Sequence, residues 1–194
     1  MTLYPYALFF HIAGVLGLFI ANGLALTVVF RLRAAKTTTQ VREWMSVNSA
    51  LEKILPVSAL LILASGLYMT FTAWGWSQAW IDLSLGVLIV LGVLGPAING
   101  RRLKAIHLAV EVAPDGEVPA SLQQRISDPV LRAYALIPGF LLLGVVGLMT
   151  LKPDWIGSGV VVVVAFVVSL IAGQLSRGTP HEAQDAKERA RPSW

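Results

Sequence analysis

Three side chains of this sequence could hold a metal ion or a haem iron: one histidine and two methionines. His11 lies early in the first apolar stretch, and Met69 and Met149 lie near the ends of two later stretches. One imidazole and two thioethers are soft ligands that suit copper(I), and a His/Met pair also ligates haem iron. The chain has no cysteine, which excludes iron–sulfur clusters and thiolate metal sites. His11 is therefore the first candidate for binding a cofactor.

Five long apolar stretches carry these side chains. Each has the roughly 18–24 residues that a helix needs to cross the hydrocarbon core of a bilayer. Hydrophobic residues make up 56% of the chain and charged residues only 13%, against about 25% charged in ordinary soluble domains. Strands are excluded, because open sheet edges are not satisfied in lipid and the alternating pattern of a barrel is missing. The predicted spans are 7–30, 54–71, 81–98, 130–151 and 155–175.

Lysine and arginine predict how the spans are oriented. Of the 15 such residues, all but Lys152 fall in the loops after the first and third spans, at the edge of the fourth span next to that loop (Arg132), or in the C-terminal segment. Cytoplasmic loops carry this excess of positive charge, so we expect the N-terminus outside and the C-terminus in the cytoplasm of a bacterial inner (plasma) membrane. The charge is accordingly assigned to orientation near anionic lipid and not to nucleic-acid binding. Aromatic residues mark the predicted outer boundary, as an interfacial belt does: Tyr4, Tyr6, Trp74, Trp76, Trp80 and Trp155.

The expected fold is an all-α polytopic bundle, with an antiparallel four-helix core and a fifth helix added to it. Residues 1–176 form one transmembrane domain, and residues 177–194 form a polar cytoplasmic tail. Asp128-Pro129 reads as the N-cap and first residue of the fourth span. A helix is also expected over 37–53, beginning at a run of threonines; it either lies flat on the membrane or extends the second span.

Polar positions inside the spans suggest which faces point into the bundle. His11 and Asn22 are eleven residues apart, so they differ by only about 20° around a helix axis, and small residues share that face. Ser65, Tyr68 and Asp82 are further polar residues of the second and third spans. His11, Met69 and Met149 all lie a few residues from the predicted outer boundary. If spans one, two and four are neighbours, these three side chains converge near the outer leaflet.

Several alternatives remain open at this stage. A lone membrane histidine is often a hydrogen-bonded structural residue, and methionine is an ordinary gap filler. Prolines in three spans and polar stripes on two helices are also compatible with a cofactor-free transporter or channel-like protein. Faces of small residues are compatible with an accessory subunit that packs against a membrane partner or a second copy of the chain. A haem held by His11 and His107 is excluded, because these residues fall on opposite sides of the predicted membrane.

The first span resembles the opening of a broad group of small bacterial inner-membrane proteins. Its stretch Phe10-His11-Ile12-Ala13-Gly14-Val15-Leu16-Gly17 is similar to the start of the copper-resistance protein D (CopD) family, of the HemJ-type membrane protoporphyrinogen oxidases, and of related uncharacterised families. The segments 64–69, 74–81 and 96–103 resemble the uncharacterised families most. The resemblance covers roughly residues 5–150.

The resemblance implies a role for the first histidine. In the oxidases the histidine of the first span is implicated in haem binding, and His11 matches its position; in the copper-resistance family it would belong to a route for copper. We therefore expect a membrane protein that binds haem b or copper near the outer leaflet through His11, with Met69 and Met149 as further ligands and Asn22, Ser65, Tyr68 and Asp82 lining the bundle. No catalytic motif identifies an enzyme.

Overall fold

A computed structural model describes residues 3–175, without the side chains of residues 132–134 and 175; the predicted tail at 177–194 lies outside the described residues. The described chain is helical throughout, and its only β pairing is an isolated bridge between Thr37 and Glu117. In chain order the elements are α1 (Tyr4–Ala34), α2 (Thr38–Met69), the π-helix η1 (Thr70–Trp74), α3 (Ala79–Gly95), the π-helix η2 (Pro96–Gly100), α4 (Arg101–Glu111), α5 (Ala120–Ile126), α6 (Pro129–Leu151) and α7 (Trp155–Leu175).

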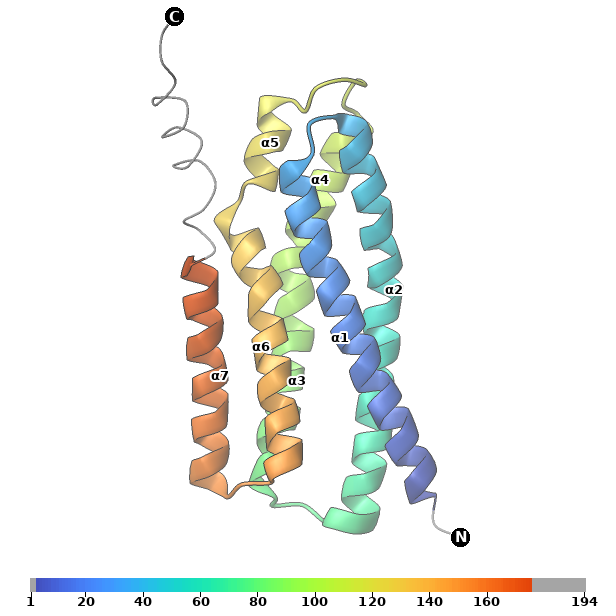
Figure 1. Cartoon of the computed structure of the whole chain (residues 1–194). Helices are drawn as coiled ribbons and strands as arrows, with labels where there is room; N and C mark the ends of the chain where they lie inside the picture. Colours follow the sequence, from blue (N-terminus) through green and yellow to red (C-terminus); the bar gives the residue numbers. More distant parts are fainter. Residues whose placement is uncertain (1–2, 176–194) are drawn as a thin grey trace, which may run out of the picture.

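Five of the helical segments in the described chain are long and apolar enough to cross a membrane. The prediction of a five-span all-α bundle is therefore confirmed. Helices α1 and α2 pack closely as an antiparallel pair, α6 contacts α1 and α3, and α7 lies at the edge against α6 and α3 (Figure 1). The N-terminus, the α2–α3 turn and the α6–α7 turn lie together at the lower end in Figure 1, called the N-terminal end below.

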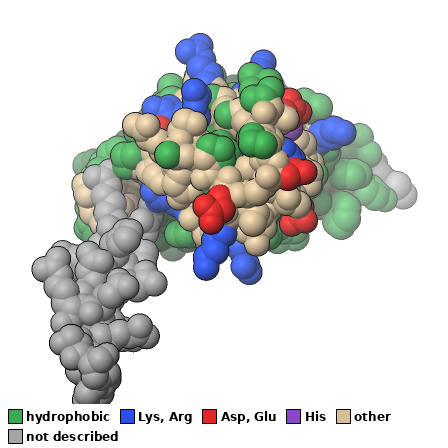
Figure 2. Space-filling model, turned by 90° about the horizontal axis from the view of Figure 1, so that it is seen from above, with side chains coloured by type: hydrophobic (Ala, Val, Ile, Leu, Met, Phe, Trp, Pro, Cys, Tyr) green, Lys and Arg blue, Asp and Glu red, His purple; other side chains and the backbone are tan. Residues whose placement is uncertain are grey.

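The opposite end, called the basic end below, carries helices that continue beyond the apolar segments. Helix α2 is unbroken from Thr38 to Met69 and has Pro56 in its interior, so segment 37–53 extends the second span instead of lying flat on the membrane. Helix α4 likewise continues α3 through η2, which begins at Pro96. Seen from above, Lys and Arg side chains stand around the rim of this end, with Asp and Glu among them (Figure 2).

The largest core of the molecule lies toward this basic end. It joins α1, α2, α4, α5 and the start of α6, and its central side chains are almost completely shielded. This core therefore holds the five segments together through close side-chain packing. The core residues with no more than 2% exposure are Ala21, Val28, Val29, Leu32, Val41, Leu51, Ile106, Val110, Leu122, Ile126 and Leu131.

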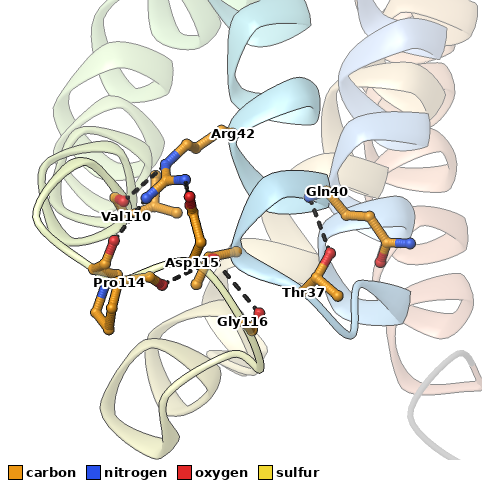
Figure 3. Close-up of polar contacts among 9 residues, drawn as sticks. Thr37, Gln40, Arg42, Val110, Pro114, Asp115 and Gly116 are labelled. Atoms are coloured by element: carbon orange, nitrogen blue, oxygen red, sulfur yellow. Dashed lines mark hydrogen bonds and ion pairs between the residues drawn. The ribbon is translucent and has the colours of Figure 1, made fainter.

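Arg42 ties the start of α2 to the loop between α4 and α5 (Figure 3). Its guanidinium donates to the carbonyl oxygens of Val110 at 3.3 Å and Ala113 at 2.6 Å, and it pairs with the Asp115 carboxylate. The fork of five N–H donors on arginine suits this capping of several acceptors at once. The Thr38 hydroxyl donates to the Pro114 carbonyl at 3.1 Å from the same turn of α2. The loop is thus held to α2 by side chains.

Both predicted N-caps are present. The Thr37 hydroxyl accepts from the amide of Gln40 at 3.3 Å at the start of α2, and an Asp128 carboxylate oxygen accepts from the amide of Val130 at 2.8 Å at the start of α6. These bonds satisfy amides that the first helical turn leaves without partners. Asp128 also receives a bond of 2.8 Å from Arg102, which joins α6 to α4 at the basic end.

Candidate functional site: a cavity at the N-terminal end

The α1–α2 pair positions His11, and glycines allow the two helices to approach. A Cβ at Gly14 would lie 2.8 Å from Ile62 Cγ1 and 3.0 Å from the carbonyl oxygen of Ser58, and one at Gly17 would lie 2.3 Å from Ser58 Oγ. A side chain at Gly14 would press on the backbone of α2, and one at Gly17 would require the Ser58 hydroxyl to move. Small residues serve this purpose in membrane helices, where burial from water no longer drives helices together. The close contact brings α2 within reach of the His11 ring.

His11 makes two polar contacts, both through Nδ1. This nitrogen lies 3.2 Å from the carbonyl oxygen of Ile62 and 3.2 Å from the hydroxyl oxygen of Ser65. A carbonyl oxygen can only accept a hydrogen bond, so Nδ1 carries the proton and donates it. In the neutral ring Nε2 then keeps its lone pair. Among residues 3–175, Nε2 has no hydrogen-bond partner.

Two residues of α2 fit around the His11 ring. Ser65 donates its own hydroxyl proton to the Leu61 carbonyl one turn earlier, so its oxygen can accept from His11. Gly66 leaves room for the imidazole, because a Cβ there would lie 3.3 Å from Cε1 and 3.4 Å from Nδ1. The ring is therefore fixed in orientation and in tautomer by α2.

His11 faces a cavity of about 360 Å³ between α1, α2, α3 and α6. Its lining residues belong to the N-terminal end of the bundle, and the cavity is partly open to the surface. Its wall toward the basic end comes from a small apolar cluster that includes Leu18, Ile62 and Leu142. Its volume falls within the range of small-molecule and cofactor sites, about 300–1,000 Å³. Almost all of its lining is apolar, which suits a ligand that enters from lipid.

Aromatic and polar side chains gather where the cavity reaches the N-terminal end. Trp74 and Trp80 meet edge to face, with ring centroids 5.4 Å apart. The ammonium nitrogen of Lys152 lies 4.0 Å from the centroid of the Trp74 ring and 5.8 Å from that of Trp80. All three residues line the cavity, as do Tyr4 and Trp76. We call Trp74, Trp80 and Lys152 the mouth cluster.

The structure brings all three predicted ligand residues to this cavity. Met69 lies at the end of α2 and is 8% exposed, whereas Met149 lies near the end of α6 and packs against the cluster formed by Trp80, Ile81 and Leu148. Both methionines line the cavity together with His11. Helix α1 contacts both α2 and α6, as the expected convergence requires; the role of the three residues as ligands stays a prediction.

The predicted bundle-lining residues lie in different places. Ser65 contacts His11, but Asn22, Tyr68 and Asp82 are not part of the cavity wall. Asn22 faces α6, since a Cβ at Gly139 would lie 2.9 Å from its amide nitrogen. Asp82 lies in the first turn of α3 and is half-buried, as is Tyr68 in the last turn of α2. Within residues 3–175, no three His, Asp or Glu side chains gather as a metal site.

Sequence reasoning missed two parts of the site. The first is the carbonyl of Ile62, which no residue pattern could indicate, because it depends on how α1 and α2 cross. The second is the mouth cluster, for which a signal existed: Lys152 is the one basic residue on the predicted outer side, and it is flanked in space by two tryptophans of the predicted aromatic belt.

Comparison with known proteins places these helices in a family. No curated protein and no solved structure matched the chain. The model of one family matches residues 6–153, a range that takes in α1 through α6 apart from the first two residues of α1 and stops before α7. The match covers well over half of the chain and includes every residue named in the cavity except Tyr4. The chain therefore belongs to the family described as "Predicted integral membrane protein (DUF2269)".

Proposed function

We propose that this integral membrane protein binds haem in the cavity at the N-terminal end, where His11 would hold the iron. One observation carries the proposal: His11 lines an apolar cavity while it donates from Nδ1 to the Ile62 carbonyl and has no partner at Nε2 among the described residues. Metal-binding histidines commonly donate their other ring N–H to a backbone carbonyl, which orients the ring and makes the ligating nitrogen more basic. A purely structural histidine does not need a cavity beside its second nitrogen.

The chemistry of the cavity fits haem better than a copper ion. The donors would suit copper(I), because imidazole and thioether are soft ligands. A single ion, however, would leave most of about 360 Å³ empty among apolar side chains, and interiors rarely keep such space unfilled. A flat apolar macrocycle uses the walls as well as the donors. The resemblance of the first span to the HemJ-type oxidases also supports haem.

Each residue of the site then has a distinct part. His11 binds the iron, and Ser65 and the Ile62 carbonyl hold its ring. Met69 or Met149, which also line the cavity, would offer a thioether as a second ligand. The apolar wall that includes Leu18, Phe19 and Leu142 excludes water. A haem with these ligands would supply one-electron chemistry, so the protein would act as a redox or haem-handling component of the membrane.

We further infer that the membrane is the bacterial inner membrane and that the N-terminal end faces outward. The distribution of lysine and arginine supports this orientation. Alkaline phosphatase fused after Lys152 should be active, because the enzyme needs an oxidising compartment for its disulfides. The same enzyme fused after Glu111, at the end of α4, should be inactive. The reverse result would invert the topology.

The test of haem binding is the absorption spectrum of the detergent-purified protein, as isolated and after incubation with haem. The wild type should show a Soret band, and His11→Ala should lose it. The control variant His107→Ala should keep the band, since His107 lies on α4 at the basic end. Met69→Leu and Met149→Leu should identify the second ligand, because only the variant that removes it should shift the spectrum of the reduced protein.

Metal analysis of the same samples distinguishes the alternatives. If the wild type contains copper but shows no Soret band, and His11→Ala loses the copper, then the cofactor is copper and not haem. A featureless spectrum and no metal, even after incubation with haem, would overturn the proposal. The cofactor-free transporter and the accessory subunit would then be the remaining hypotheses, and transport into vesicles and isolation of a stoichiometric partner would be the next measurements.

A further inference from the structure

We propose that Lys152 binds the propionate carboxylates of the haem at the mouth of the cavity. This inference rests on the proposed function, because it assigns the residue that recognises the charged edge of the same ligand. The cavity offers one cation at its opening and apolar walls behind it. A ligand that matches this arrangement has an apolar body and an anionic end.

The backbone at the end of α6 is specialised at this residue. Lys152 has φ 49° and ψ 51°, in the left-handed region, and its amide donates to the Leu148 carbonyl at 2.9 Å. Glycine is the usual residue in this position after a helix, because side chains are strained there. Here a long charged side chain takes the position instead. The turn directs Lys152 to line the cavity together with Met149 and Thr150.

Two tryptophans hold the ammonium group in place. It lies 4.0 Å from the ring centroid of Trp74, a distance at which the negative face of an aromatic ring attracts a cation. Trp74 ends the π-helix η1, and Trp80 lies in the first turn of α3, so the cluster joins α2, α3 and α6 at one point. The cation is thus positioned before a ligand arrives.

No carboxylate neutralises this cation within residues 3–175. The nearest acidic residue in the sequence is Asp154, whose carboxylate accepts from the amide of Gly157 at 2.8 Å and caps the start of α7. Lys152 is paired only with aromatic rings. An ammonium group that lacks a carboxylate partner gains more binding energy from an incoming anion than an ammonium group that is already in an ion pair.

The arrangement sets the direction in which haem enters the site. With the propionates at Lys152, the charged edge of the haem would remain at the mouth of the cavity, and its apolar part would contact the inner walls. Tyr4 and Trp76 also line this opening, and each carries one hydrogen-bond donor. The inner cavity wall, formed by Leu18, Phe19 and Ile62, offers no partner for a carboxylate.

The test compares haem with haem dimethyl ester, in which both carboxylates are masked. Dissociation constants would be measured by Soret titration of the full chain in detergent, with quenching of tryptophan fluorescence as a second readout. The wild type should bind haem on the order of tenfold more tightly than the ester, the effect expected from a hydrogen bond to a charged group. Lys152→Met should bind both with the weaker affinity, and Lys152→Arg should restore the preference.

Lys53→Met is the matched control, because Lys53 is an exposed lysine of α2 away from the cavity; it should retain the preference for haem. Equal binding of haem and its ester to the wild type would overturn the role of Lys152 while leaving haem binding intact, and this comparison requires no variant to fold. Loss of preference in Lys53→Met would also overturn it, since the effect would then be one of overall charge. Absence of a Soret band with either compound would instead overturn the proposed function.

Discussion

The two ends of this bundle are packed in different ways. At the basic end, five helical segments meet around side chains such as Leu32, Ile106 and Ile126, which have no exposed surface. At the N-terminal end, the helices enclose a cavity, and two small clusters form its walls. The distribution of Lys and Arg predicts that the basic end reaches water. The hydrophobic effect drives apolar side chains together in water, whereas in lipid an apolar side chain gains little by leaving its neighbours.

The two regions therefore have different roles, one in stability and one in forming the cavity. The basic end fixes the positions of α1, α2, α4 and α6 relative to one another. The N-terminal end can then keep an open space between the same helices without losing their arrangement. A ligand site held from one end in this way needs few polar contacts of its own, and the His11–Ile62 contact is the main one found. Variants in matched pairs can test whether this contrast is real.

The largest loss of stability is expected from truncating a buried side chain in the core at the basic end. Ile106→Ala removes a completely buried side chain of α4, and comparable substitutions cost roughly 2–5 kcal/mol. Thermal unfolding in detergent should show a marked fall in Tm. The control Leu108→Ala, at a position 53% exposed on the same helix, should change stability by about 0.5 kcal/mol or less. Equal losses would mean that the basic end is not the better packed region.

The second largest effect is expected from enlarging a buried side chain, which should destabilise the basic end but not the cavity. Val110→Phe forces a ring into a position with no exposed surface, and overpacking of this kind costs roughly 1–3 kcal/mol. Val145→Phe places the same ring at the cavity wall, where space exists for it, so Tm should hold or rise. Haem titration should nevertheless show weaker binding to Val145→Phe. A similar destabilisation by both variants would argue that the cavity is closed in solution.

Two glycines of α1 test the helix crossing beside His11. Gly14→Ala would place a methyl group 2.8 Å from Ile62 Cγ1, so α1 and α2 must separate and stability should fall by on the order of 1 kcal/mol. Gly23→Ala meets no atom within 4 Å and should be neutral or stabilising, because alanine favours a helix by about 0.5–1 kcal/mol over glycine. The same sign for both variants, measured by Tm, would contradict the close crossing.

The smallest effect is expected from the arginine at the basic end. Arg42→Gln should remove most of the bonds to Val110, Ala113 and Asp115. These groups are partly solvated and can bind water instead, so the loss should lie at the lower end for a hydrogen bond, about 0.5 kcal/mol. Hydrogen exchange should become faster at the amides of residues 113 and 115–118 and remain unchanged at α7. The control Lys104→Gln alters an exposed cation of α4; unchanged exchange in both variants would deny Arg42 this role.

The spans and their ends follow from local properties and could be predicted. Long apolar runs require helices in lipid, and the caps at Thr37 and Asp128 follow from side-chain chemistry. The shared face of His11 and the depths of Met69 and Met149 also follow from helix geometry. Asn22 shows where this reasoning ended: its angle on α1 is close to that of His11, but it faces Gly139 of α6 and not the cavity.

By itself, the sequence determined that the chain forms five membrane-spanning helices, where they begin, and which of their residues could ligate a metal, because these depend on composition and on the spacing of one helix at a time. Only the tertiary structure decided that segment 37–53 continues the second span as one helix, that the Ile62 carbonyl accepts a hydrogen bond from His11, and that the Lys152 ammonium lies over the Trp74 ring. Those contacts join residues about 50 to 80 positions apart, and their geometry depends on where the glycines let helices cross.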